Sequence, residues 1–254
     1  MNTLNSMKSI VNSISPLRKL ADLALDKYKK EFKDAILDGV FYTGGPDVLI
    51  AIVKAFELQR QSALAGRGLF DGHAYYEFGM YKGFSFWFAE QLAREYTDSN
   101  FRFLGFDSFE GLPQPQLDVE ARLYRKGDFR GSYEIVTGNL RKHKADLTRM
   151  RLYKGFYSEH LFRQLREKEQ FPPVSICLID VDLYESCVPV LDFIKEYLVE
   201  GSILLFDDYN QIGENDDAGE RRALIEFEKR NPTFKKEHLF NYGWEGVAFR
   251  VVSL

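Results

Sequence analysis

The chain has few cysteines and no long apolar run. Its two cysteines, Cys177 and Cys187, are too few for a disulfide framework or a thiolate metal site, which indicates a reducing compartment. The longest uninterrupted apolar run, Val48 to Val53, is far shorter than the roughly 18 residues of a membrane-spanning helix. Residues 1–20 lack the apolar stretch of a signal peptide. We therefore expect a soluble, cytoplasmic protein.

An excess of charge of one sign is also missing. The 34 basic and 38 acidic side chains give a net charge of −4, which provides no overall field to hold nucleic acid or an anionic membrane. We therefore predict no nucleic-acid partner and no membrane partner.

Three nucleotide-site signatures are also absent: the Gly-x-Gly-x-x-Gly fingerprint, the Gly-Lys-Ser/Thr of a Walker loop and the Tyr-x-x-x-Lys pair of short-chain dehydrogenases.

The start of the chain has a helical pattern. One helix is predicted from Pro16 to Gly39, and a second from Pro46 to just before Gly66, because apolar residues recur there at helical spacing. We interpret residues 1–70 as an N-terminal helical extension that covers the substrate or contacts a second subunit.

Residues 71–254 alternate between short apolar runs and helical patterns, which is typical of an α/β fold with a mostly parallel sheet. The last two runs are joined by a short turn, which favours an antiparallel hairpin at the end of the sheet. The predicted strands lie near 74–78, 101–106, 149–154, 174–179, 202–206, 234–240 and 245–252. The predicted helices lie near 83–96, 132–143, 157–169, 185–199 and 218–230.

Acidic residues gather where two neighbouring predicted strands end. Asp180 and Asp182 follow the fourth strand, and Asp207 and Asp208 follow the fifth. Four carboxylates at adjacent strand ends would repel one another unless cations or protons lie among them. Hard divalent cations prefer oxygen ligands, so this pattern favours a Mg²⁺ site over two separate helix caps.

Two other strand ends indicate a nucleoside site. A glycine turn from Glu77 through Gly79 to Gly83 follows the first strand, where backbone amides can approach an anionic or polar ligand. Asp107 follows the second strand, at the position where an acid typically accepts hydrogen bonds from ribose hydroxyls. Taken alone, the glycines are equally consistent with a structural turn. Asp107 could be a turn cap, but with the glycine turn upstream we favour the ribose role.

Five ordered motifs resemble the macrocin-type sugar O-methyltransferases. They are Glu77-x-Gly79-x-x-x-Gly83, Asp107-Ser-Phe-Glu-Gly-Leu-Pro113, Gly155-Phe156, Asp180-Val-Asp-Leu-Tyr-Glu-Ser186 and Asp207-Asp-Tyr209. This resemblance implies a Rossmann-like class I methyltransferase fold and S-adenosylmethionine as cofactor. It also implies Mg²⁺, a sugar or glycosylated small molecule as acceptor of the methyl group, and a homodimer.

The same resemblance implies roles for individual residues. Asp182 would be the general base, with Asp180 beside it in the catalytic set. Asp180, Asp207 and Asp208 would hold the metal ion. The cofactor would be bound by Glu77, Gly79, Gly83, Ser85, Asp107, Ser108, Gly155, Phe156 and Asp180.

Two rival interpretations remain open from the sequence. Asp180-Val-Asp182 also fits the Asp-x-Asp metal motif of a sugar-nucleotide glycosyltransferase. The chain could instead be a catalytically silent member of the fold that serves assembly. Two segments have no assigned role: 114–127, which is long enough to form a lid, and the acidic stretch 213–220, which either borders the substrate or is solvated.

Overall fold

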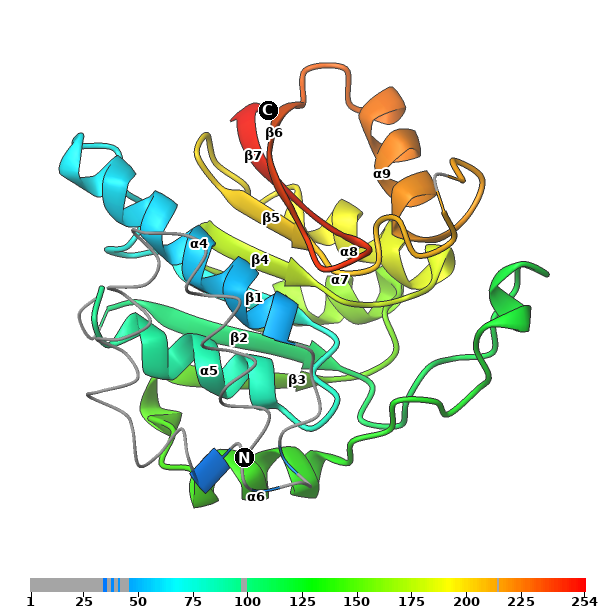
Figure 1. Cartoon of the computed structure of the whole chain (residues 1–254), viewed down its shortest axis with the longest axis horizontal. Helices are drawn as coiled ribbons and strands as arrows, with labels where there is room; N and C mark the ends of the chain where they lie inside the picture. Colours follow the sequence, from blue (N-terminus) through cyan, green and yellow to red (C-terminus); the bar gives the residue numbers. More distant parts are fainter. Residues whose placement is uncertain (1–33, 36–37, 39–40, 42–45, 97–99, 214) are drawn as a thin grey trace.

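One seven-stranded sheet forms the centre of the protein (Figure 1). In this computed structural model, residues 34–35, 38, 41, 46–96, 100–213 and 215–254 are described. The strand order is β3-β2-β1-β4-β5-β7-β6, with β1 to β5 parallel and β7 antiparallel to both β5 and β6. The strands are β1 (Ala74–Phe78), β2 (Arg102–Asp107), β3 (Met150–Lys154), β4 (Val174–Ile179), β5 (Ile203–Phe206), β6 (Lys235–Tyr242) and β7 (Gly246–Ser253). The predicted sheet, including its antiparallel hairpin, is confirmed.

Helices cover both faces of this sheet. Residues of α4, α5 and α6 pack in one apolar core, and residues of α7, α8 and α9 pack in a second core on the opposite face. The helices are α4 (Pro46–Leu64), α5 (Phe84–Ala93), α6 (Tyr133–Lys142), α7 (Glu159–Lys168), α8 (Tyr184–Ile194) and α9 (Gly219–Arg230). Two short 3₁₀ helices are η1 (Glu120–Arg122) and η2 (Leu147–Arg149).

The strand β1 shows why the sheet is buried on both sides. Successive side chains of a strand point to opposite faces, so Tyr75 packs in the first core while Tyr76 and Phe78 pack in the second. All five residues of β1 are buried. A strand covered on both faces needs an almost continuous apolar sequence, and for this reason its position could be predicted.

Local caps determine where two helices begin. Ser132 precedes α6 and its hydroxyl accepts the backbone N–H of Ile135, while Ser158 precedes α7 and accepts that of Leu161. Both helices lie on the return path from one parallel strand to the next. Their starts therefore fix the loops that leave the carboxyl ends of the strands.

The N-terminal predictions are met only in part. The second predicted helix corresponds to α4, which packs against α5 and approaches β4, β5 and β6. The first, from Pro16 to Gly39, lies almost wholly outside the described residues. The division at residue 70 stays a prediction. Among the described residues no helix is both long and apolar enough to cross a membrane.

Candidate functional site

A cavity of about 690 Å³ lies at the carboxyl ends of the parallel strands. Residues that follow each of β1 to β5 line it, and so do residues of the β6–β7 turn. The sheet order places β1 beside β4, where the chain path reverses direction across the sheet. Such a switch point is where open α/β sheets bind their ligands.

Gly79 is required where β1 meets β4. Its φ of 86° lies in the left-handed region, and a Cβ added there would be 1.7 Å from the carbonyl oxygen of Asp180. The Gly79 N–H also meets the Tyr157 hydroxyl at 2.8 Å, and that hydroxyl donates to the carbonyl of Phe106 at 2.8 Å. Tyr157 therefore ties together the ends of β1 and β2.

Asp107 lines the cavity and holds two turns together. One carboxylate oxygen accepts the Met80 N–H at 2.7 Å and the other accepts the Phe109 N–H at 2.6 Å. The cap that we considered as an alternative is therefore present. Each carboxylate oxygen can accept a second hydrogen bond, so the predicted ribose role is compatible with it. Ser108, next in the chain, also lines the cavity and donates to the carbonyl of Gly111.

Glu77 lies beneath the cavity instead of lining it. The residue is fully buried, and its two oxygens accept the hydroxyls of Tyr75 and Ser85, each at 2.7 Å. Ser85 does line the cavity. Burial raises the pKa of Glu77 to about 8, and the two hydroxyl donors oppose that rise. Through Ser85, this acid shapes the cavity wall.

Of three further residues predicted to bind the cofactor, one lines the cavity and two support it from the turns behind. Phe156 lines the cavity, with 41% of its surface exposed. Gly83 and Gly155 are not among the described lining residues. Gly83 has a φ of 84° at the start of α5, and Gly155 donates its N–H to the carbonyl of Asp107. Both glycines form the turns that carry the lining residues.

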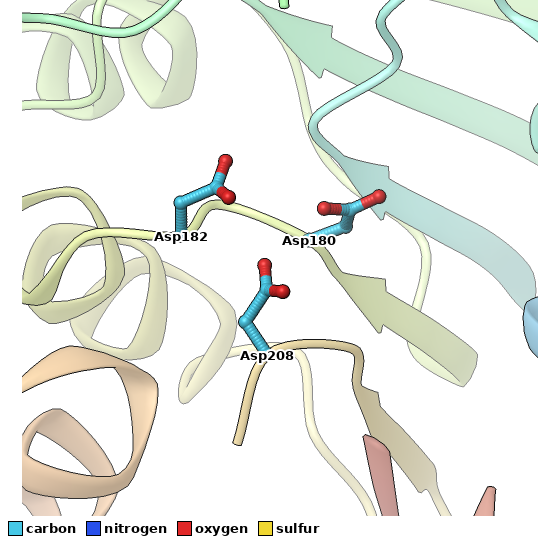
Figure 2. Close-up of side chains that lie close together, drawn as sticks. All are labelled: Asp180, Asp182 and Asp208. Carbon is cyan, nitrogen blue, oxygen red and sulfur yellow. The ribbon is translucent and has the colours of Figure 1, made fainter. Parts of the chain in front are cut away.

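Three aspartates converge at the ends of β4 and β5. One carboxylate oxygen from each of Asp180, Asp182 and Asp208 lies within 4.8 Å of the others. Figure 2 shows the three side chains turned toward a common point from two separate loops. Asp208 Oδ1 accepts the Gln211 side-chain amide, while its buried Oδ2 has no hydrogen-bond partner. An oxygen-only set of this kind fits a hard divalent cation.

This set differs from the sequence prediction in one residue. Asp182 belongs to it, whereas Asp207, which we expected as a ligand, does not. Asp207 lines the same cavity, where burial raises its pKa to about 6, the Tyr242 hydroxyl opposes that rise and the neighbouring acids Glu245 and Asp47 add to it. The spacing along the chain could not show this, because adjacent residues such as Asp207 and Asp208 point in different directions.

The backbone at Asp182 is bent to bring its carboxylate into the group. Its φ of 58° is in the left-handed region, and the N–H of Leu183 meets the carbonyl of Val181 at 2.6 Å around it. A residue other than glycine in this conformation is costly, and such positions concentrate at functional sites.

Burial and crowding shift the acids toward their protonated forms. Burial, opposed by the Tyr124 hydroxyl, raises the pKa of Asp182 to about 7. Burial first, and then the neighbouring carboxylates, raise the pKa of Asp180 and Asp208 well above the usual range. Among the described residues no Lys, Arg or His lines the cavity. No described basic side chain of the lining therefore balances these carboxylates when they are ionised, and protons or a bound cation would have to do so.

Two buried glutamates that we did not single out brace the site. Glu220, at the start of α9, accepts the N–H of Val181 and that of Asp208, each at 3.2 Å. Glu120, on η1, accepts the N–H of Tyr184 and that of Gly219, each at 2.9 Å. Both glutamates are fully buried. The solvated interpretation of segment 213–220 is therefore wrong for Glu220.

The strand order and the cavity at the switch point are those of a Rossmann-like fold. The structure matches the O-methyltransferase NovP with a TM-score of 0.64 and 17% identity, over 80% of this chain and 79% of that chain. It matches the calicheamicin methyltransferase CalS11 with a TM-score of 0.61 and 21% identity, over 92% and 90%. At this level of identity the likeness shows the fold. Comparison with curated proteins found no match.

A third solved structure has the same fold and contains SAH. The *Bacillus cereus* O-methyltransferase, in complex with SAH, matches with a TM-score of 0.54 and 14% identity, over 99% of this chain and 100% of that chain. Residues 71–250 match the model of the macrocin-O-methyltransferase (TylF) family. The chain belongs to that family. The predicted family, fold and O-methyltransferase activity are confirmed, and the glycosyltransferase interpretation is set aside.

Proposed function

We propose that the protein transfers a methyl group from S-adenosylmethionine to a hydroxyl of a sugar or glycosylated small molecule, with the help of Mg²⁺. The observation that carries this proposal is the convergence of Asp180, Asp182 and Asp208 within 4.8 Å beside the cavity. A sugar hydroxyl is a poor nucleophile near neutral pH, so its activation needs a proton acceptor and stabilisation of the developing negative charge.

The residues divide these tasks. Gly79, Ser85 and Asp107 line the cavity on the side of β1 and β2 and bind the cofactor there. Asp182, which lies beside Asp180 at the cavity, accepts the proton of the acceptor hydroxyl. The bound ion would lower the pKa of that hydroxyl. Holding the two reactants in one cavity contributes further through orientation.

Asp180 and Asp208 are the two metal ligands on which the sequence and the geometry agree. The third ligand is Asp182 by distance and Asp207 by family resemblance. We propose Asp182, because its oxygen already lies with the other two. The Mg²⁺ affinities of two variants test which aspartate is the third ligand. Asp182→Asn should weaken Mg²⁺ binding more than Asp207→Asn does, and the reverse order would support the ligand set implied by the resemblance.

A mass-spectrometric screen tests the activity. Glycosides are incubated with the protein, S-adenosylmethionine and Mg²⁺, and a product heavier by one methyl group is sought. The same incubation with excess EDTA should yield no product. Undiminished methylation in EDTA would contradict the role of the metal, and turnover in the first incubation would exclude a catalytically silent protein.

Asp182→Asn tests the base. At Mg²⁺ concentrations that saturate the variant, the substitution should still reduce turnover at least about 100-fold, the lower end of what a general base contributes. Binding of S-adenosylhomocysteine, measured by calorimetry, should stay close to that of the wild type. The matched control is Asp118→Asn, an exposed aspartate outside the cavity lining. Equal loss of turnover and cofactor binding would contradict the assigned role. The homodimer and the cytoplasmic location stay predictions.

A further inference from the structure

Glu220 occupies an unusual position for a carboxylate. It lies in the first turn of α9, is fully buried, and among the described residues makes no ion pair with a lysine or arginine. Burying a carboxylate without a counter-charge is costly, so such a residue needs a compensating role. Its hydrogen bonds indicate what that role is.

The two oxygens of Glu220 reach two different loops. Oε1 accepts the N–H of Val181, which stands between Asp180 and Asp182, and Oε2 accepts the N–H of Asp208. One side chain thereby joins the loop after β4 to the loop after β5. These two loops carry all three carboxylates of the aspartate group. Glu220 thus contributes, beyond the backbone pairing of β4 with β5, to the separation of the two loops.

A second buried glutamate, Glu120, holds the start of α9, the helix that carries Glu220. The N–H of Gly219, the preceding residue, donates to Glu120 at 2.9 Å, which fixes the start of α9. Burial first, and then Asp208, raise the pKa of Glu220 well above its usual range, and Glu220 in turn is among the carboxylates that raise the pKa of Asp180. Glu220 can therefore influence the group by position and by charge, and a test must separate the two.

We propose that Glu220 is a positioning residue that sets the separation of the two aspartate loops and, through it, the affinity of Asp180, Asp182 and Asp208 for a divalent cation. This inference rests on the proposed function. Groups that hold metal ligands in place typically change metal affinity by about 10-fold to 100-fold when they are removed.

Two substitutions separate position from charge. Glu220→Gln keeps the length of the side chain but replaces one acceptor oxygen with a donor, which would face a backbone N–H. Glu220→Asp keeps the charge and both acceptor oxygens but is one methylene shorter, so it cannot reach both loops. The matched control is Glu226→Gln on the same helix, whose carboxylate accepts the Tyr184 hydroxyl and the Arg222 guanidinium instead.

The experiment is calorimetric titration of the full chain with MgCl₂ in the presence of S-adenosylhomocysteine. Both Glu220 variants should bind Mg²⁺ at least about tenfold more weakly than the wild type. Their affinity for S-adenosylhomocysteine should change less than twofold, and Glu226→Gln should match the wild type in both titrations. A selective loss of this kind is not expected from general destabilisation, which would weaken both ligands together.

Three outcomes would overturn the inference. Unchanged Mg²⁺ affinity in both variants would show that Glu220 does not position the aspartates. Wild-type affinity in Glu220→Asp with a loss in Glu220→Gln would assign the effect to charge alone. Equal loss of both ligands would indicate a structural role. If Glu220→Gln does not fold, Glu220→Asp carries the comparison. A wild-type protein that takes up no Mg²⁺ would instead contradict the proposed function.

Discussion

Gly79 has the tightest steric constraint in the candidate site. We expect Gly79→Ala to destabilise the protein by about 3 kcal/mol or more, because it combines a left-handed φ with a Cβ placed 1.7 Å from the Asp180 carbonyl oxygen. It should also abolish binding of S-adenosylhomocysteine in calorimetry. The matched control is Gly72→Ala, which has a φ of 70° but meets nothing within 4 Å. Equal effects of the two substitutions would show that the close approach is unimportant.

Glu77 should make the stability of the protein depend on pH. Burial raises its pKa from the ordinary 4.5 to about 8, so between these values the folded state binds more protons than the unfolded state. Stability should therefore fall as pH rises through this window, by up to about 1.4 kcal/mol per pH unit from this group. In Glu77→Gln that contribution should disappear.

Denaturant unfolding at a series of pH values measures this effect as the difference between wild type and Glu77→Gln. The difference should favour the variant increasingly as pH rises toward 8. Glu110→Gln serves as control, because Glu110 is exposed. A difference that stays flat with pH would show that Glu77 is already ionised in the folded protein at low pH.

The segment between β2 and α6 is anchored by η1. Glu120 accepts two helix-start N–H groups, and Glu185 of α8 accepts the backbone N–H of Gln116 from the same segment. Further back, Leu112 exchanges backbone hydrogen bonds with Gly127 and Asp128. Segment 114–127, which is long enough to form a lid, is thus attached by hydrogen bonds to the first residues of α8 and α9.

Glu120→Ala should detach segment 114–127 from α8 and α9. Two backbone N–H groups would lose their acceptor, at a cost of about 1–3 kcal/mol, and trypsin should then cleave faster after the exposed Arg122, Arg125 and Lys126. Limited proteolysis with mass mapping measures this. Asp118→Ala, an exposed residue of the same segment, should cleave as the wild type does. Equal cleavage rates in both variants would mean that Glu120 does not anchor the segment.

The positions of the strands could be predicted closely from the sequence. The buried glutamates that join the loops after these strands by hydrogen bonds could not be predicted. Runs at 101–106 and 174–179 are apolar because both faces of the sheet are covered, and each run ends at an aspartate that marks the edge. Glu220 stands in an acidic stretch whose composition is typical of a solvated loop. Its hydrogen-bond partners are backbone groups 39 and 12 positions away in the sequence. A local pattern holds no information about such distant partners.

The candidate site shows the same division. Parallel strands end at one edge of a sheet, so the meeting of the aspartates followed from strand order. Which carboxylates face one another depends on side-chain direction, set here by the left-handed backbone of Asp182. This is why the carboxylate of Asp182, and not that of Asp207, lies within the group of three, while the metal role expected for Asp207 stays a prediction. The buried position of Glu77, below the cavity and behind Ser85, likewise depends on packing between β1 and α5.

The protein as a whole carries a net charge of only −4, yet its cavity gathers acids without a basic residue among the described lining. Such local repulsion lowers the stability of the empty protein, and a bound divalent ion relieves it. We therefore expect Mg²⁺ to raise the melting temperature more than Na⁺ does at equal ionic strength. At a free Mg²⁺ concentration of 100 times the dissociation constant, the gain would be about 2.7 kcal/mol.

Asp208→Asn makes this prediction specific. The variant should lose most of the response to Mg²⁺, because it removes one of the three converging carboxylates. Without Mg²⁺ it should melt above the wild type, since the repulsion is weaker while the volume of the side chain is almost unchanged. Asp192→Asn, an exposed aspartate on α8, should respond to Mg²⁺ as the wild type does. An equal response of all three proteins would mean that Mg²⁺ acts through general screening and that the three aspartates do not form a cation site.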